Sequence, residues 1–173
     1  MIHLIGTHHK FQIAGVVPND EFLTYLSKAV IEMKATVLAE EMNADGEKIL
    51  GGPEGKSIAT IVAERFKIQH LYCDPNKAER KTLGIRSDSD IMEQAMSAWF
   101  ISDENPNIVA DRERRKDFPV REGFWLQKLR PYLAAPSIVF VCGADHIETF
   151  KVLLVSDSNN VSIHCREWTD SSS

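Results

Sequence analysis

The sequence predicts an α/β fold, built on a mostly parallel sheet of about four to five strands with helices on both faces. Three observations lead to this fold class. Short apolar runs alternate along the 173 residues with segments in which apolar residues recur at helical spacing. Most of these apolar runs are continuous, which is typical of strands buried on both faces. The length also suits one domain that buries its own core.

Five apolar runs are the expected strands. The first covers residues 2–5 and stops at Gly6, and the fourth covers residues 137–142 and reads Ser-Ile-Val-Phe-Val-Cys. Because these two are the most continuously apolar, we expect them to be inner, parallel neighbours in the sheet. The remaining expected strands cover residues 35–39, 68–73 and 161–165.

The segments between these runs are expected to be mainly helical. Ser57 has the residue type that caps a helix, and Pro119 should kink or divide the longest helix. Residues 43–55 are expected to be a loop, because they are rich in glycine and charge. The expected helices cover residues 18–33, 58–66, 88–100, 108–133 and 145–154.

Composition and charge weigh against several classes of partner. The net charge of −5 at pH 7 argues against a nucleic-acid surface. The basic run at residues 112–116 is interleaved with acidic residues, so we expect a solvated helix face there. No apolar stretch is long enough to span a membrane, and the first residues do not resemble a signal peptide. We therefore expect a cytoplasmic protein that binds neither nucleic acid nor membrane, and we leave its oligomeric state open.

The chain is expected to be a single α/β domain over residues 1–169, followed by a disordered tail at residues 170–173. Cys73, Cys142 and Cys165 are far apart and lack CxxC spacing, which fits free thiols in a reducing cytosol. Cys73 and Cys142 end strands, so a reactive thiol is one interpretation. A small buried hydrophobic residue is the favoured one.

Polar residues follow four of the expected strands. Because the carboxyl ends of parallel strands meet at one edge of a sheet, and ligands bind outside that edge, these residues predict a common site. Two of the four segments, Gly-Thr-His-His at residues 6–9 and Gly-Ala-Asp-His at residues 143–146, also match each other. The residues are His8 and His9, Glu40 and Glu41, Asp74, and Asp145 and His146.

The residue types at this edge suit two chemistries. His9, His146 and Glu41 are the candidate catalytic residues. His9, His146 and Glu40 form a candidate ligand set for a divalent metal such as Mn, Co or Zn, which would lower the pKa of a bound water. Without a metal, one histidine can act as a general base, because its ordinary pKa lies near neutrality. In the alternative interpretation, the histidines only bond neighbouring backbone groups.

Two more residues are candidates for binding the substrate. Arg121 can bind a carboxylate or phosphate through two parallel hydrogen bonds. Its position in the helical pattern, taken alone, indicates an exposed helix residue. Asp74 can contribute to the site or cap a helix that begins near Asn76. Glu79 and Arg80, one turn further on, are expected to form only a surface pair.

Taken in order, these residues resemble the superfamily of erythromycin esterases, ChaN-like haem-uptake proteins and TraB/PrgY/Tiki proteins. Members of that superfamily carry one Gly-x-x-His after the first strand and another near the end of the chain, which correspond to residues 6–9 and 143–146. The chain looks most like small bacterial members that share the Cys-Asp-Pro, Arg-Glu-x-x-Trp-Leu and Val-Cys-Gly-Ala-Asp-His segments. The other matching positions are Glu40 or Glu41, and Arg121 followed by Glu122.

The resemblance implies several activities. Tiki-like members look like metal-dependent proteases, erythromycin esterases open a lactone with a histidine and no metal, and ChaN-like members bind haem. The present chain departs from them because it is much shorter, lacks membrane segments and adds an Asp-Pro-x-x-x-Glu-Arg segment at residues 74–80. The resemblance therefore supports a site and says little about its substrate.

Three functional hypotheses follow from the sequence. The first is a hydrolase of the esterase or metallopeptidase type, acting on a small molecule or a peptide. The second is a binding module that holds haem or a nucleotide in the same crevice without turnover. The third is a partner-binding domain in which the histidines are structural.

Overall fold

A computed structural model describes residues 1–14, 19–50 and 55–170. Its five strands form one sheet in the order β3-β2-β4-β1-β5, and every neighbouring pair is parallel. The expected α/β fold with a parallel sheet is therefore confirmed. The strands are β1 (Ile2–Thr7), β2 (Val37–Glu40), β3 (Gln69–Tyr72), β4 (Ile138–Gly143) and β5 (Val161–Trp168).

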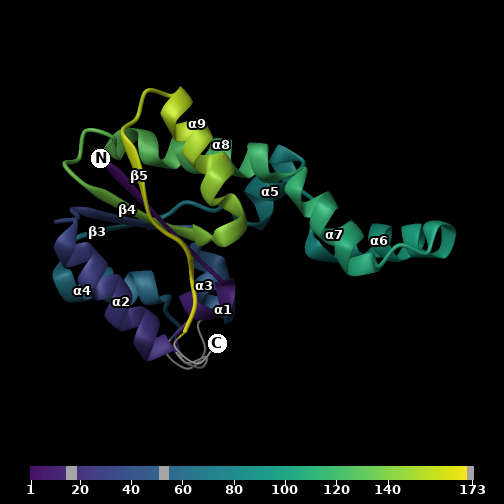
Figure 1. Ribbon diagram of the computed structural model, residues 1–173, viewed down its shortest axis with the longest axis horizontal. Coiled ribbons are helices and arrows are strands. Elements are labelled where there is room, and N and C mark those ends of the chain that lie inside the picture. Colours follow the sequence, from purple (N-terminus) through teal and green to yellow (C-terminus); the bar gives the residue numbers. More distant parts are fainter. Residues whose placement is uncertain (15–18, 51–54, 171–173) are drawn as a thin grey trace.

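Helices cover both faces of this sheet, as Figure 1 shows. Successive side chains of a strand point to opposite faces, so each buried strand contributes to two cores. Leu4 packs with the helices on one side, while its neighbour Ile5 packs with those on the other. On one face lie α1 (His9–Gln12), α2 (Asn19–Glu32) and α4 (Ile58–Phe66), and on the other lie α8 (Phe118–Leu129) and α9 (Ile147–Ser156).

The centre of the sheet is formed by β4 and β1. The two strands pair in parallel from Ile2 opposite Ile138 to Thr7 opposite Gly143. Every residue of β4 is buried, as expected for a strand covered on both faces. The prediction that the first and fourth apolar runs are inner, parallel neighbours is confirmed.

Gly6 does not end the first strand, as the sequence had suggested, because β1 continues to Thr7. Its partner β5 is also longer than expected, and the register between them shifts twice beyond Leu4. A Cβ atom on Gly6 would lie 1.9 Å from the carbonyl oxygen of Arg166. Glycine is therefore required here by the close approach of the β5 backbone rather than by a turn.

Two helices begin after an asparagine cap, and the first of them was not expected. Residues 43–55 were expected to be a loop, yet α3 covers Ala44–Leu50, and the Asn43 side chain accepts the N–H of Gly46. Residues 51–54 of that expected loop lie outside the described part of the chain. Asn76, not Asp74, caps α5 (Lys77–Leu83), and Glu79 completes the capping box. The expected cap at Ser57 is confirmed.

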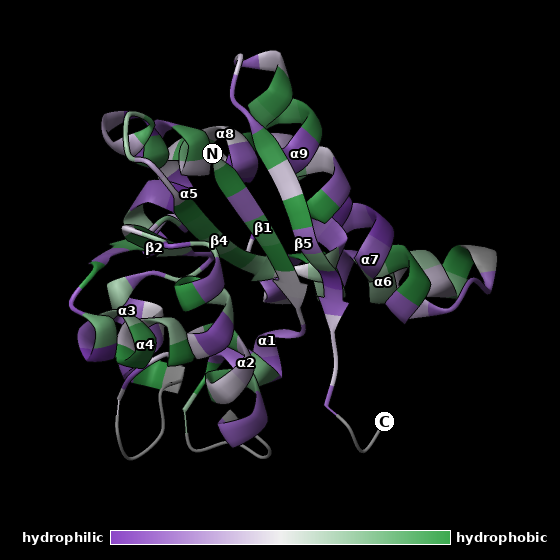
Figure 2. Cartoon of the chain, turned by 60° about the vertical axis from the view of Figure 1, so that its left-hand side comes forward, coloured by the Kyte–Doolittle hydropathy of each residue, from purple (hydrophilic) through white to green (hydrophobic). Residues whose placement is uncertain are grey.

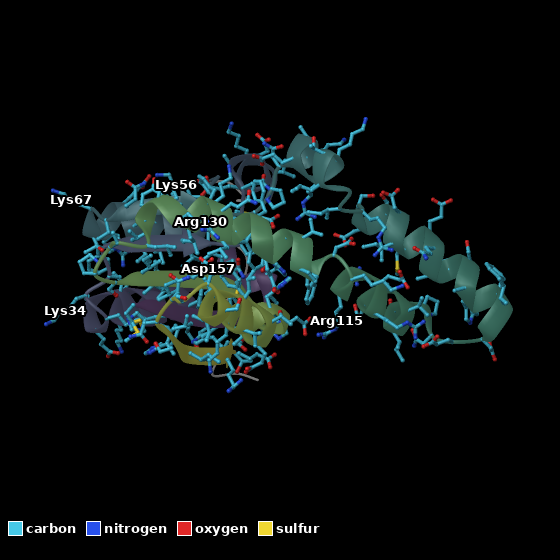
Figure 3. The ribbon with its side chains drawn as sticks, turned by 90° about the horizontal axis from the view of Figure 1, so that it is seen from above. Lys34, Lys56, Lys67, Arg115, Arg130 and Asp157 are labelled. Carbon is cyan, nitrogen blue, oxygen red and sulfur yellow. The ribbon has the colours of Figure 1, made fainter. Side chains whose placement is uncertain are left out.

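The long helix expected at residues 108–133 is divided, as Pro119 suggested. It forms α7 (Pro106–Arg115) and α8, and Pro119 lies in the first turn of α8, where a missing N–H costs nothing. Together with α6 (Asp88–Ser102), α7 forms a helical hairpin, called the arm below, which projects from the rest of the molecule (Figure 1). Figure 3 shows Arg115 where the arm meets the body.

No helix within the described residues combines the length and the apolar character needed to cross a membrane. Of the expected C-terminal tail, residues 171–173 lie outside the described part of the chain.

Replacing Gly6 by alanine should destabilise the fold, because the new methyl group meets backbone atoms that cannot move without breaking the pairing of β1 and β5. We expect a loss of about 3 kcal/mol in the free energy of unfolding, measured by urea denaturation.

The matched control is Gly123→Ala. Gly123 lies inside α8, and a Cβ atom there meets nothing within 4 Å. Alanine at that position should instead gain about 0.5–1 kcal/mol, because it favours the helix. Equal denaturation midpoints for Gly6→Ala and the wild type would contradict the backbone contact.

Candidate functional site

A cleft of about 860 Å³ lies outside the carboxyl ends of the strands. Figure 2 shows the arrowheads of β4, β1 and β5 at one edge of the sheet, next to the base of the arm. Three adjacent strands of the sheet, β2, β4 and β1, end at this cleft. The residues that line it include Glu41 after β2, His146 after β4 and His9 after β1. The parallel topology thus gathers residues that are far apart in the sequence.

Glu41 lies at the centre of these contacts, and its side chain is fully buried. Its Oε1 accepts a hydrogen bond from Nη2 of Arg121 at 2.7 Å, and its Oε2 accepts the backbone N–H of Gly143 at 2.7 Å. The same Oε1 lies 3.8 Å from Nε2 of His9 and 3.6 Å from Nε2 of His146. The structure therefore brings the three candidate catalytic residues together around one carboxylate.

These neighbours decide the charge of Glu41. Burial by itself raises the pKa of this carboxyl, but Arg121, then His9, His146 and the Gly143 N–H, outweigh burial and lower the pKa to about 2. Glu41 consequently keeps its negative charge throughout the neutral range. A carboxylate with so low a pKa is a weak base at neutral pH.

His146 is held rigidly on the wall of the cleft. Its Nδ1 lies 2.8 Å from Oε1 of Glu122, which also accepts the hydroxyl of Thr149 at 2.5 Å. With Glu122 ionised, Nδ1 carries the proton and Nε2 is left as an acceptor. The rings of Phe118 and Trp125 pack against the imidazole, with centroids 3.7 Å and 4.7 Å away. Glu122 was not predicted to have this role, because nothing in its spacing along the sequence indicates contact with His146.

His9 is the exposed member of the pair, with 62% of its side chain accessible. It begins the short helix α1, directly beyond the end of β1. Its Nε2 comes so close to Gly143 that a Cβ atom there would lie 3.3 Å from it, and equally close to Oε2 of Glu41. The absence of a side chain at Gly143 therefore lets the histidine and the carboxylate approach the end of β4.

Arg121 and Asp74 form a buried ion pair beneath the cleft. Nη2 and Nε of Arg121 donate to Oδ1 of Asp74 at 2.7 and 3.1 Å, and Nε1 of Trp125 donates to the same oxygen at 3.1 Å. Arg80 donates to the other oxygen of Asp74, so the interpretation of Arg80 as half of a surface pair with Glu79 was wrong. Although burial lowers the pKa of Arg121, the charges of Glu41 and Asp74 raise it overall.

This pairing changes the expected roles of Arg121 and Asp74. Arg121 was expected to receive an anionic substrate group, but its guanidinium already neutralises Glu41 and Asp74. An incoming anion would have to compete with two buried carboxylates for it. The geometry favours Arg121 and Asp74 as the residues that position Glu41.

Glu40 does not join this group. Adjacent residues of a strand point to opposite faces, so Glu40 and Glu41 diverge at the end of β2. Oε1 of Glu40 accepts the hydroxyl of Ser57 at 2.6 Å and lies 2.8 Å from Nε2 of His70. The candidate ligand set of His9, His146 and Glu40 is therefore not assembled.

Glu41 in place of Glu40 does not complete a metal site. Both of its oxygens already accept hydrogen bonds, and the Arg121 guanidinium on Oε1 would repel a second cation. No group of three or more His, Cys, Asp or Glu residues within the described part of the chain has an arrangement that could hold a metal ion. The donor set does not fit a divalent metal.

The charged residues of the cleft are dominated by carboxylates. Among the described residues, eight carboxylates and five arginines line it, and no lysine does. Each of the arginines is paired with acidic groups: Arg80 with Asp74, Arg86 with Glu113 and Asp117, Arg114 with Asp88 and Asp111, Arg121 with Glu41 and Asp74, and Arg166 with Glu148.

The cysteines do not add a nucleophile to this group. Cys73 and Cys142 are buried, and burial raises the pKa of both thiols. A thiol that stays protonated is inert, which agrees with their interpretation as small core residues.

No family model, curated protein or solved structure matches this chain. The superfamily resemblance therefore stays a prediction that rests on the positions of its motifs.

Replacing Glu41 by glutamine should make the free energy of unfolding fall less steeply as the pH is lowered. A carboxyl whose pKa falls from about 4.5 in the unfolded chain to about 2 in the folded one stabilises the fold above pH 4.5. That contribution is lost as the pH falls through about 2. We expect Glu41→Gln to be less stable than the wild type at pH 7, and the difference to shrink by pH 3.

Urea denaturation at both pH values measures this difference. Glu64→Gln is the control, because Glu64 is an exposed partner of Lys56 and should give a small, nearly constant difference. If the difference in the free energy of unfolding between Glu41→Gln and the wild type were the same at pH 7 and pH 3, the neighbours of Glu41 would not lower its pKa.

Proposed function

We propose that this protein is a hydrolase in which His146 acts as the general base that activates a water molecule. The observation that carries the proposal is the Glu122–His146 pair, in which a buried carboxylate holds the imidazole so that its Nε2 faces Glu41, a residue of the cleft wall. Such an acid–histidine pair prepares a base of fixed orientation and tautomer. The superfamily resemblance adds support, since it implies a site at the same residues.

His146 is suited to take a proton from water. Its Nε2 lies 3.6 Å from Oε1 of Glu41, which is too long for a hydrogen bond. The Nε2 lone pair therefore remains available to accept a proton from water. Water that loses its proton to Nε2 attacks the carbonyl carbon of an ester or amide, and the electron pair of the C=O bond moves to oxygen. Glu122 stabilises the imidazolium that forms.

Glu41 supplies fixed charge in this proposal rather than taking up a proton. Its pKa of about 2 makes it a poor base, but its negative charge lies within 4 Å of both histidines. In a largely water-excluded environment, a fixed charge at this distance stabilises a developing imidazolium more than it would in water. Arg121 and Gly143 keep the carboxylate in place.

His9 is suited to the opposite proton transfer. It is exposed, so it can exchange protons with solvent, and it faces the same carboxylate as His146. We assign to it the general acid that protonates the leaving group when the tetrahedral intermediate collapses. The bond to the leaving group breaks in that step, and the proton comes from the His9 ring.

The charge of the cleft points to a neutral or cationic substrate. Its acidic groups outnumber its arginines, and those arginines are already paired with carboxylates. A volume of about 860 Å³ accommodates a small molecule or a few residues of a peptide. Haem propionates and nucleotide phosphates would meet net negative charge, which weighs against the rival binding module.

Replacing His146 by glutamine should lower kcat/KM by a hundredfold or more, because general-base catalysis contributes about 10²–10⁴ in rate. The assay is hydrolysis of nitrophenyl and thiocholine esters and of a dipeptide amide library. The control is His164→Gln, since His164 is exposed on β5 and should leave activity unchanged. Wild-type protein that hydrolyses none of these substrates, but binds one of them stoichiometrically, would replace the hydrolase with the binding module.

Replacing Glu122 by glutamine tests whether that carboxylate positions and supports His146. We expect kcat to fall by about ten- to a hundredfold, because the amide no longer stabilises the imidazolium. KM should change little, and this split between kcat and KM is one that a general loss of structure would not produce. Glu122→Asp should recover part of the kcat. An unchanged kcat in Glu122→Gln would remove Glu122 from the mechanism.

A further inference from the structure

Glu122 is a buried carboxylate that no basic residue of the described chain neutralises. Its side chain is 3% exposed, and its ion-pair partner among the described residues is the imidazole of His146. Glu41, by contrast, has the guanidinium of Arg121. A buried carboxylate is stable only when it is paired or hydrogen-bonded. The hydrogen bonds that Glu122 accepts therefore decide how firmly it is held.

Thr149 supplies one of these hydrogen bonds. Its hydroxyl donates to Oε1 of Glu122 at 2.5 Å, and the same oxygen lies 2.8 Å from Nδ1 of His146. A hydroxyl has a single proton to donate, and its other acceptor is the backbone carbonyl oxygen of His146 at 3.3 Å. A hydrogen bond to a charged acceptor is shorter and stronger than one to a carbonyl, so the hydroxyl proton belongs to Glu122. One oxygen of Glu122 thus receives two donors.

The fold places these two donors one turn apart at the start of the same helix. His146 immediately precedes α9, and Thr149 lies in its first turn, so the two residues face the same side. Glu122 comes from α8, which shares a hydrophobic cluster with α9 (Figure 1). The last torsion of a glutamate side chain is broad, so one hydrogen bond would leave the carboxylate free to turn. The second hydrogen bond restricts that rotation.

We propose that Thr149 is a positioning residue of the site, whose hydroxyl fixes Glu122 so that the proton of neutral His146 stays on Nδ1. The inference rests on the proposed function, because this tautomer is the one that offers the Nε2 lone pair to water. Without the hydroxyl, Glu122 can rotate, and the tautomer with its proton on Nε2 becomes populated. That tautomer cannot accept a proton at Nε2 and is inactive as the base.

Thr149→Val tests the proposal, because valine keeps the branched side chain and removes the hydroxyl. Thr149 is exposed, so the change should cost little stability. We expect kcat to fall about three- to tenfold, the contribution of one hydrogen bond, with KM nearly unchanged. Thr149→Ser retains a hydroxyl and should recover most of the kcat.

The matched control is Thr82→Val. Thr82 is exposed on α5, and its hydroxyl donates to the carbonyl oxygen of Ala78 in the same helix. The control therefore removes a helical threonine hydroxyl that makes no contact with Glu122, and kcat should stay at the wild-type value.

A double-mutant comparison shows whether Thr149 acts through Glu122. In the Glu122→Gln background the hydroxyl has already lost its charged acceptor, so adding Thr149→Val should change kcat by less than about twofold. A loss as large as in the wild-type background overturns the proposal.

Heteronuclear NMR of the His146 ring gives a readout that needs no substrate. At about pH 8.5, where an unperturbed imidazole is neutral, the wild type should carry its proton on Nδ1 and none on Nε2. Thr149→Val should show a mixture of the two tautomers, whereas Thr149→Ser should resemble the wild type. Such a shift in a protein that hydrolyses no substrate supports the positioning role of Thr149 and refutes the hydrolase.

An unchanged tautomer in Thr149→Val overturns the positioning role, even where the hydrolase proposal stands. An unchanged kcat of this variant in an active protein overturns it as well. Circular dichroism checks that the variant is folded. If it is not, Thr149→Ala takes its place, with the same expected results and the same outcomes against the proposal.

Discussion

The candidate site depends on one buried charge, the carboxylate of Glu41. Removing an ionised carboxylate from water is costly unless it is paired and hydrogen-bonded. Arg121 supplies the opposite charge, and the Gly143 N–H supplies a further hydrogen bond. These contacts connect the end of β2, helix α8 and the end of β4. The same requirement extends to Asp74, because a single guanidinium bridges both carboxylates.

The histidines take their roles from this charge and from their different burial. His146 is buried between Phe118 and Trp125 and is oriented by Glu122. His9 is exposed at the rim of the cleft. Two imidazoles that are chemically equivalent in the sequence thus become one rigid group and one solvent-linked group. A site that must move protons in both directions can use this difference.

The sheet and the arm both form walls of the cleft, but they differ in how well they are packed. The sheet is stabilised by continuous apolar strands, so its carboxyl edge is a rigid platform. The arm has a small core and contributes Asp88, Ile91 and Asp111 to the cleft wall.

The sequence by itself determined the α/β fold, the central pair of strands and the positions of the polar residues at their ends, because continuous apolar runs and glycine–histidine segments are local signals. It also indicated where the long helix divides, since proline lacks an N–H. It did not determine that Gly6 stays within a strand, or that Asn43 caps a helix. Only the tertiary structure decided that Glu41 rather than Glu40 faces the cleft, that Arg121 is already neutralised and that Glu122 orients His146. The physical reason is that these contacts join residues from 24 to 102 positions apart, and their partners are chosen by strand order and by the need to pair buried charge, neither of which is a local property of the chain.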